Sequence, residues 1–248
     1  MLAGIAIAIG AVGAGIASAG IHIGFFFQPT GVLIVLGGTL GVTFITTPRL
    51  ALYRATRSAT ALLRTAPENR QALMEEIVAL ARTARSKGIL GLEPRISMIT
   101  RPFLSESLQW AMDARDHAEL RTTLEMKLRQ LERQGETDAR AFEIAGGFAP
   151  TIGVIGTVIG LMDVLRQFSN LSSVAAGTGT AFVSTIYGLA LANLILLPAA
   201  QRMRAHIAEQ FETNEMIVEG ILSLFDGLNP ALVRDRLSCF LRREEQGL

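Results

Sequence analysis

Cysteine and histidine are scarce in this 248-residue sequence. It has a single cysteine, Cys239, and three histidines, His22, His117 and His206, which lie far apart in the chain. One cysteine cannot form an internal disulfide, and without neighbouring sulfur or imidazole ligands it does not make a metal site. The histidines match neither an HExxH motif nor a nucleophile–base arrangement, which hydrolytic and metal-dependent enzymes need. The absences argue against an enzyme, and we expect no bound cofactor.

Charge is missing from two long stretches. Residues 1–48 contain no Lys, Arg, Asp or Glu, and residues 144–201 contain only Asp163 and Arg166. A hydrocarbon core about 30 Å thick takes roughly 20 helical residues to cross, so each stretch is long enough for two spans. We therefore predict an all-α membrane protein with four transmembrane helices and a helical cytoplasmic loop and tail.

The predicted organisation has four parts. Residues 1–48 hold spans at about 2–20 and 31–47, the second ended by Pro48. Residues 49–143 form a cytoplasmic helical domain that is broken at Gly88, Gly91 and Pro94. Residues 144–201 hold spans at about 144–165 and 180–200, and residues 202–248 form a cytoplasmic helical tail.

Basic residues set the expected topology. The segment 49–143 has 16 Lys/Arg and the tail from residue 202 has six, whereas the short loops near residues 22–29 and 166–177 have only Arg166. Cytoplasmic segments near spans retain Lys and Arg, so both large blocks and both termini are expected inside. The 16 basic residues of the loop barely exceed its 13 acidic ones, which does not indicate nucleic-acid binding.

The third and fourth spans each carry a stripe of small residues at steps of three and four. The stripes are Pro150, Gly153, Thr157 and Gly160 on the third span and Thr178, Ala181, Thr185, Gly188 and Ala192 on the fourth. Small residues let membrane helices approach closely. Thr157 and Thr185 both lie roughly 20 Å from the cytoplasmic end of their spans, so their hydroxyls are expected at the same depth. Two hydroxyls at one level can line an ion path, or each can bond its own i−4 carbonyl.

Asp163 is the only carboxylate expected at membrane depth. Its place near the outer interface, three residues before Arg166, favours an interfacial ion pair over a role in conduction. A titrating carboxylate for a proton path would then come from another chain.

Four segments resemble a known family. They are VLIVLGGTLGVTFITTP (32–48), GGFAPTIGVIGTVIGL (146–161), FVSTIYGLALANLILLPAAQRM (182–203) and EGILSLFDGLNP (219–230). In this order they are similar to the MotA/PomA family of flagellar stator subunits, part of the MotA/TolQ/ExbB ion-channel superfamily. The resemblance implies a multi-pass protein of the bacterial inner membrane in which five copies surround a dimer of a single-span, MotB-like subunit whose aspartate carries H⁺ or Na⁺.

The resemblance also implies roles for individual residues. Thr157, Thr185 and the adjacent Ser184 match the ion pathway, and Pro150 and Pro198 match two prolines used in the conformational cycle. Arg85 and Glu93 match the residues with which the family engages the rotor protein FliG, and Lys87 is one position away from the usual second basic residue.

Two other functions remain open. ExbB/TolQ proteins, which energise envelope processes, share the pattern of the last two spans but have one span, not two, before their main cytoplasmic segment. A non-conducting membrane scaffold is also compatible with a single chain. The sequence decides neither between H⁺ and Na⁺ nor which device is driven.

Overall fold

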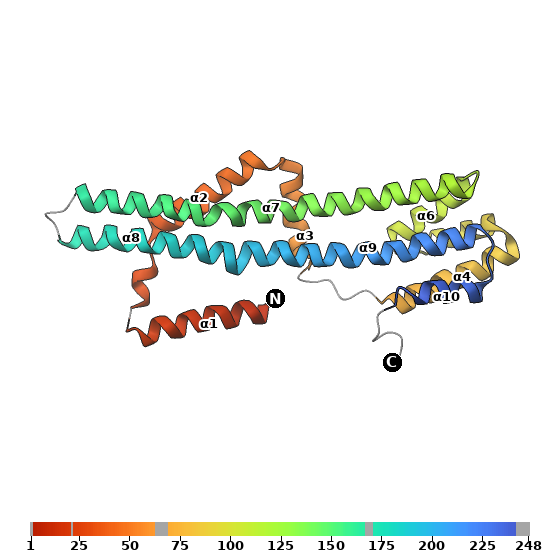
Figure 1. Cartoon of the computed structure of the whole chain (residues 1–248), viewed down its shortest axis with the longest axis horizontal. Helices are drawn as coiled ribbons and strands as arrows, with labels where there is room; N and C mark the ends of the chain where they lie inside the picture. The colour runs from red at the N-terminus through yellow and green to blue at the C-terminus, as the bar shows by residue number, and fades with distance from the viewer. Residues whose placement is uncertain (1, 21, 63–68, 167–170, 242–248) are drawn as a thin grey trace. The chain divides into compact units, whose positions relative to one another are not determined.

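Most of the part of the chain that the structure describes is helical. The computed structural model describes residues 2–20, 22–62, 69–166 and 171–241, and these ranges contain no β-strand (Figure 1). The chain divides into two compact units, which are treated separately below. The first comprises residues 1–63 and 136–204, and the second comprises residues 64–135 and 205–248.

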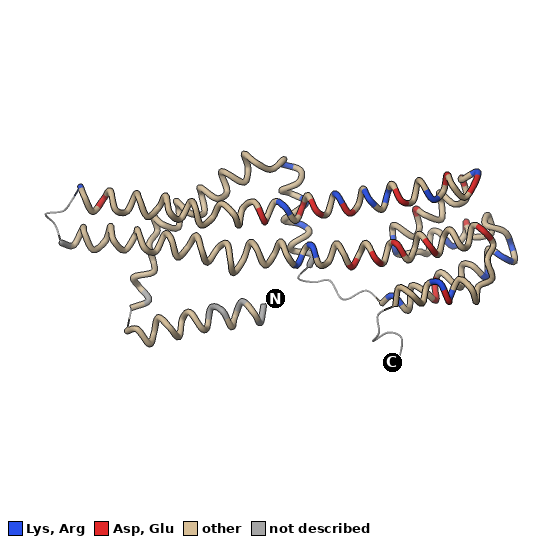
Figure 2. Tube along the Cα trace, viewed as in Figure 1, with Lys and Arg blue, Asp and Glu red and all other residues tan. Residues whose placement is uncertain are grey.

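The first unit holds the apolar helices. Its elements are α1 (Leu2–Ser18), η1 (Ile23–Phe26), α2 (Pro29–Thr46), α3 (Arg49–Leu62), the end of α7 (His117–Arg166), α8 (Leu171–Ala190), the π-helical segment η3 (Leu191–Leu196) and the start of α9 (Leu197–Phe225). Along these helices Figure 2 shows long uncharged runs. Within the described residues, three helices are long and apolar enough to span a bilayer: α2, α7 and the stretch 172–225. The uncharged α1 has 17 residues. The predicted all-α membrane fold is confirmed.

The fourth apolar helix starts earlier than predicted. The sequence suggested a loop as far as Gly177 and a span from about Thr180, but α8 already begins at Leu171. The reason is packing: a Cβ built on Gly177 would lie 3.0 Å from the carbonyl oxygen of Gly160 in α7. The glycine therefore serves close helix contact here and does not mark a turn.

Helix α2 packs through one face against the rest of the first unit. Proline at its first turn favours the start, and Pro48 follows its end. The buried positions recur every four residues at Gly31, Val35, Thr39 and Thr43. This spacing is the signature of a helix with a single packed stripe.

The second unit has a compact apolar core. Its elements are α4 (Arg70–Lys87), η2 (Ile89–Leu92), α5 (Glu93–Ile96), α6 (Pro102–Asp113), the start of α7, the rest of α9 and α10 (Pro230–Ser238). The core is built from Leu, Ile, Val and Met side chains of these helices, including Leu73, Ile77, Leu104, Leu108, Leu120, Leu124, Ile217, Ile221 and Leu237. Local capping sets the helix starts, since the side chain of Asn69 accepts from the amide of Ala72 at 2.9 Å.

Candidate functional site

The small faces of α7 and α8 pack against each other, as the stripes predicted. A Cβ at Gly160 would lie 2.6 Å from the amide nitrogen of Ala181, and one at Gly188 would lie 2.5 Å from the carbonyl oxygen of Ala149. Both distances are shorter than real Cβ contacts, so only glycine permits this backbone approach. The two helices therefore meet backbone to backbone.

The two predicted threonines meet in this interface. The Oγ1 atoms of Thr157 and Thr185 lie 2.5 Å apart. Thr157 Oγ1 also lies 3.2 Å from the carbonyl oxygen of Gly153 and 3.1 Å from that of Ala181. Both threonines are only half-buried within the chain. Their equal depth, predicted from residue counting, is confirmed.

Four oxygen atoms therefore gather at one level, and we call them the threonine oxygen cluster: the two hydroxyls and the carbonyls of Gly153 and Ala181. A hydroxyl has one proton and two lone pairs, so Thr157 can donate to only one of its three neighbours at a time. Oxygen ligands of this kind suit hard cations and water. Thr157 contacts both its own i−4 carbonyl and the facing hydroxyl. The role of the two hydroxyls in an ion path stays a prediction.

Ser184 lies on another side of α8. It is fully buried and donates to the carbonyl of Thr180 at 2.7 Å. Its Oγ would be 2.8 Å from a Cβ on Gly156 of α7 and 2.8 Å from one on Gly31 of α2. The serine thus fills the meeting point of three helices, away from the threonine oxygen cluster, and its part in an ion pathway stays a prediction.

The two prolines have different local settings. Pro150 lies inside the continuous helix α7. Pro198 lies two residues after the end of the π-helical segment η3. At that end the N–H of Leu197 donates to the carbonyl of Ala192, five residues back. Proline has no N–H and crowds the carbonyl four residues before it, and a π turn accommodates both effects. The π turn also shifts the register of the backbone hydrogen bonds. Within this segment the side-chain amide of Asn193 donates to the carbonyl of Leu189, four residues back, at 2.9 Å.

Asp163 lies near the last described residue of α7, Arg166, and is half-buried. The predicted pair between them stays a prediction. Among the described residues no group of three or more His, Cys, Asp or Glu side chains is arranged to hold a metal ion.

The predicted rotor residues lie on a turn of the second unit. Arg85 and Lys87 are in the last turn of α4, Gly88 follows with φ of 76°, and Glu93 begins α5. The backbone is fixed from inside, because Leu92 is fully buried. All three charged side chains are exposed, and within the described ranges none has an ion-pair partner. Their charges are therefore available to another molecule.

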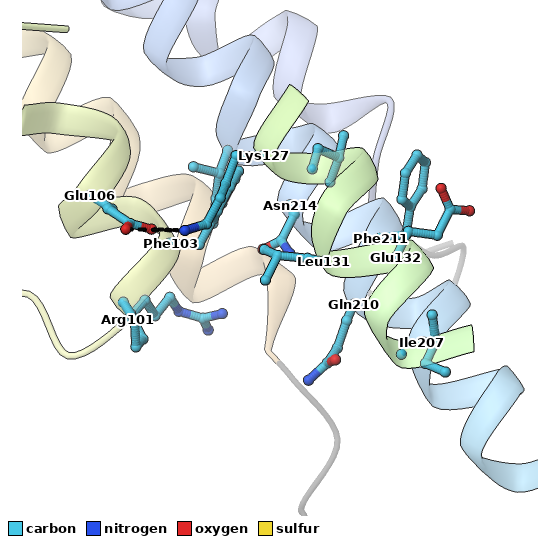
Figure 3. A pocket seen from close by; sticks show the side chains of 14 residues that line it. Arg101, Phe103, Glu106, Lys127, Leu131, Glu132, Ile207, Gln210, Phe211 and Asn214 are labelled. Carbon is cyan, nitrogen blue, oxygen red and sulfur yellow. Dashed lines mark hydrogen bonds and ion pairs between the residues drawn. The ribbon is translucent and has the colours of Figure 1, made fainter. Parts of the chain in front are cut away.

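A separate cavity of about 390 Å³ opens in the second unit (Figure 3). Its walls come from α6, α7 and α9 and include Phe103, Leu131 and Phe211. At one side Lys127 points to Glu106 and forms an ion pair of 3.1 Å. None of the predicted site residues lines this cavity.

Ion pairs join helices of the first unit next to its apolar spans. Arg54 of α3 contacts Asp138 of α7 at 3.2 Å, and Arg204 of α9 forms two bonds with Glu143, the shorter of 2.7 Å. Burial raises the pKa of Asp138, and the nearby Arg54 opposes this shift. Sequence reasoning missed these pairs because their partners are 84 and 61 residues apart.

The chain is similar to proteins of known family over nearly its whole length. Residues 2–88 match the family model described as motility protein A N-terminal, and residues 95–216 match the MotA/TolQ/ExbB proton channel family. Motility protein A of Bacillus subtilis is 27% identical over 99% of this chain and 91% of its own length. The uncharacterized protein YtxD of the same organism is 30% identical over 89% of this chain and 81% of its own length.

A solved structure is similar as well. It is the flagellar MotAB stator complex of Bacillus subtilis, whose matching chain has a TM-score of 0.89 and 26% identity and covers 99% of this chain and 97% of its own length. The two family models together account for most of the sequence, in the order in which the spans occur. The chain therefore belongs to the MotA/TolQ/ExbB proton channel family.

Proposed function

We propose that this chain is the ion-conducting stator subunit of a flagellar motor and that it converts ion flow into torque together with a MotB-like partner. The observation that carries the proposal is the threonine oxygen cluster on the packed faces of α7 and α8, the helices that match the proton channel family. The similar MotAB structure supports a MotB-type partner.

The oxygen cluster suits conduction but not storage of charge. A threonine hydroxyl neither loses nor keeps an extra proton near neutral pH, so the cluster can ligate or relay an ion without holding its charge. The two threonines of the cluster have no group that titrates near neutral pH, so a proton carrier must come from elsewhere. The MotB-like partner would bring the titrating aspartate, and H⁺ or Na⁺ would pass between this aspartate and the oxygens of the cluster.

The proposed assembly has five copies of this chain around a dimer of the single-span partner, in the bacterial inner membrane with both termini in the cytoplasm. The basic blocks at residues 49–143 and 202–248 favour this orientation. Thr157 and Thr185 are only half-buried within one chain, which is compatible with a place beside the partner at the proposed axis.

Removing one hydroxyl tests conduction directly. Thr157→Val keeps the shape of the side chain and removes the hydroxyl, and we expect ion flux about tenfold lower, the equivalent of one lost hydrogen bond. Thr157→Ser is the matched control because it restores the hydroxyl. Flux in vesicles and swimming speed are measured with membrane abundance checked, at varied Na⁺ concentration to identify the ion. Normal flux in Thr157→Val, or loss of flux in Asp163→Asn alone, contradicts the proposal.

We also propose that the turn carrying Arg85 and Glu93 contacts the rotor protein FliG, with Lys87 beside it. Exposed pairs contribute little to stability, about 0–1 kcal/mol, so charge reversal is expected to lower torque without unfolding the chain. Arg85→Glu and Glu93→Lys should each reduce swimming, and a reversed charge on FliG should restore it. Arg115→Glu, another exposed arginine of the second unit, is the control. Unchanged torque in both reversals would leave these residues as ordinary surface charges.

A role as an ExbB/TolQ-type energiser is the second candidate. The match of residues 2–88 to the motility protein A N-terminal model favours the flagellar stator. A deletion strain that swims normally but loses energised envelope transport would reverse this preference.

A further inference from the structure

Helix α3 belongs to a part of the chain whose charged residues are all basic. Between residue 1 and the first acidic residue, Glu68, there are four arginines and no lysine, aspartate or glutamate. Three of the arginines lie in α3: Arg49 is its first residue, and Arg54 and Arg57 lie near its middle. The whole helix is therefore purely cationic.

The inner side of α3 is fixed to the first unit. Ala51 is 2% exposed and Ala55 is fully buried. Arg54 turns to this side and contacts Asp138 of α7 at 3.2 Å. One of the three arginines is thus used inside the protein.

The outer side of α3 combines charge with apolar surface. Leu50 and Tyr53 are each 65% exposed, and Arg49 and Arg57 are exposed on the same arc of the helix. Neither of these two arginines contacts an acidic side chain in the ranges that the structure describes. Thr56, on the same arc, donates its hydroxyl hydrogen to the carbonyl of Tyr53, so its hydrogen-bond donor is satisfied within the helix.

The position of α3 brings this surface to the membrane. Helix α2, one of the spanning helices, ends at Thr46, and α3 begins three residues later at Arg49 after a sharp bend (Figure 1). Such a short connection keeps the start of α3 within about 10 Å of the end of the span. A helix at this height meets the headgroups.

We propose that the outer face of α3, formed by Arg49, Leu50, Tyr53 and Arg57, binds anionic phospholipid headgroups of the leaflet in which α2 ends. The inference rests on the proposed cytoplasmic placement of residues 49–143. Guanidinium groups bind phosphate oxygens through paired hydrogen bonds, and a tyrosine and a leucine fit the boundary between headgroups and acyl chains. The absence of any acidic residue from the first 67 positions removes the repulsion that such lipids would otherwise meet.

The first test measures lipid selectivity. The full-length chain is reconstituted into bilayers of equal phosphatidylglycerol and phosphatidylcholine, and the retained lipids are counted by native mass spectrometry. We expect the wild-type protein to retain phosphatidylglycerol preferentially. The double variant Arg49→Gln/Arg57→Gln should lower that preference about fivefold for each arginine.

The control variant is Arg82→Gln/Arg115→Gln, which removes two exposed arginines from the second unit and changes the net charge equally. It should retain the wild-type preference. An unchanged preference in Arg49→Gln/Arg57→Gln, or an equal fall in both double variants, overturns the proposal.

The second test asks what covers the face. A spin label is attached at Tyr53→Cys in a Cys239→Ser background, since Cys239 is the only native cysteine. Contact with lipid predicts greater accessibility to oxygen than to a water-soluble nickel complex. A label that is inaccessible to both oxygen and the nickel complex would indicate that a second copy or another protein covers α3. A label that is accessible to the nickel complex would indicate solvent. Either result overturns the proposal. Both tests use a purified protein without ion flow, so a functional Thr157→Val variant would refute conduction and leave the lipid result standing.

Discussion

Replacing Gly188 by alanine tests the close approach of α7 and α8. The added Cβ would lie 2.5 Å from the carbonyl oxygen of Ala149 and 3.2 Å from the Cα atoms of Gly153 and Pro150. These neighbours are backbone atoms, which cannot rotate away as a flexible side chain can. The helices must therefore separate locally by about 0.9 Å to reach the ordinary contact limit of 3.4 Å.

The expected loss of stability is small because two effects oppose each other. Overpacking costs about 1–3 kcal/mol, whereas alanine in a helix is favoured over glycine by about 1 kcal/mol. The net change of about 0–2 kcal/mol leaves the protein folded. The functional change is larger, since Thr185 lies one turn from Gly188 and its 2.5 Å contact with Thr157 would lengthen beyond hydrogen-bond range for hydroxyls.

Gly147→Ala is the matched control. Gly147 also lies within α7, but its Cβ would meet nothing within 4 Å. We expect Gly147→Ala to swim normally and Gly188→Ala to swim slowly, with equal amounts of both proteins in the membrane. Soft-agar spreading, ion flux and immunoblotting measure these quantities. Normal flux in Gly188→Ala would refute the link between helix spacing and the threonine oxygen cluster.

Three further variants follow from other contacts. Arg70 is 3% exposed and donates to the carbonyl of Phe240 at 3.1 Å and to the carboxylate of Glu212 at 2.7 Å. Arg70→Ala should therefore destabilise the second unit by about 3 kcal/mol. A lower melting temperature and faster proteolysis would show this loss, and unchanged values would contradict it. The hydrogen bonds from Arg234 lower the pKa of Glu75, so their stabilisation is present above the ordinary pKa of glutamate and is lost as pH falls through the lowered value. The melting temperatures of wild type and Glu75→Gln should therefore converge as the pH is lowered below the ordinary pKa of glutamate, and a difference that stays constant would refute the pairing. Pro198→Ala restores an N–H, and a structure of this variant should show α-helical hydrogen bonds through residues 191–196; a persisting π segment would mean that proline is not its cause.

Patterns that depend on neighbouring residues of one helix were predictable. The steps of three and four that bring Gly153, Thr157 and Gly160 onto one face are fixed by helix geometry, and the structure packs this face against α8. The break after Lys87 was also predictable from local sequence, because Gly88 adopts a φ of 76° that glycine tolerates and other residues rarely adopt.

Features that depend on distant partners were not predictable. The start of α8 at Leu171 rests on contact with α7, and the π-helical segment η3 combines the effect of Pro198 with the surroundings of its helix. Ser184 looked equivalent to its neighbour Thr185, but a difference of 100° around the helix turns it toward Gly31. The pair of Arg54 and Asp138 has no local signal at all.

The glycine contacts between α7 and α8 also determine what can move. Where the glycines face the opposite backbone, no flexible side chain lies between the two helices, so sliding or parting them would break many contacts at once. A torque-generating movement would cost less free energy if α7 and α8 tilted together as one rigid body. The deformation would then be confined to their ends and to the π segment before Pro198. Elasticity of the subunit would then reside in its weakest turns, and mutations there would tune compliance without altering the ion it handles.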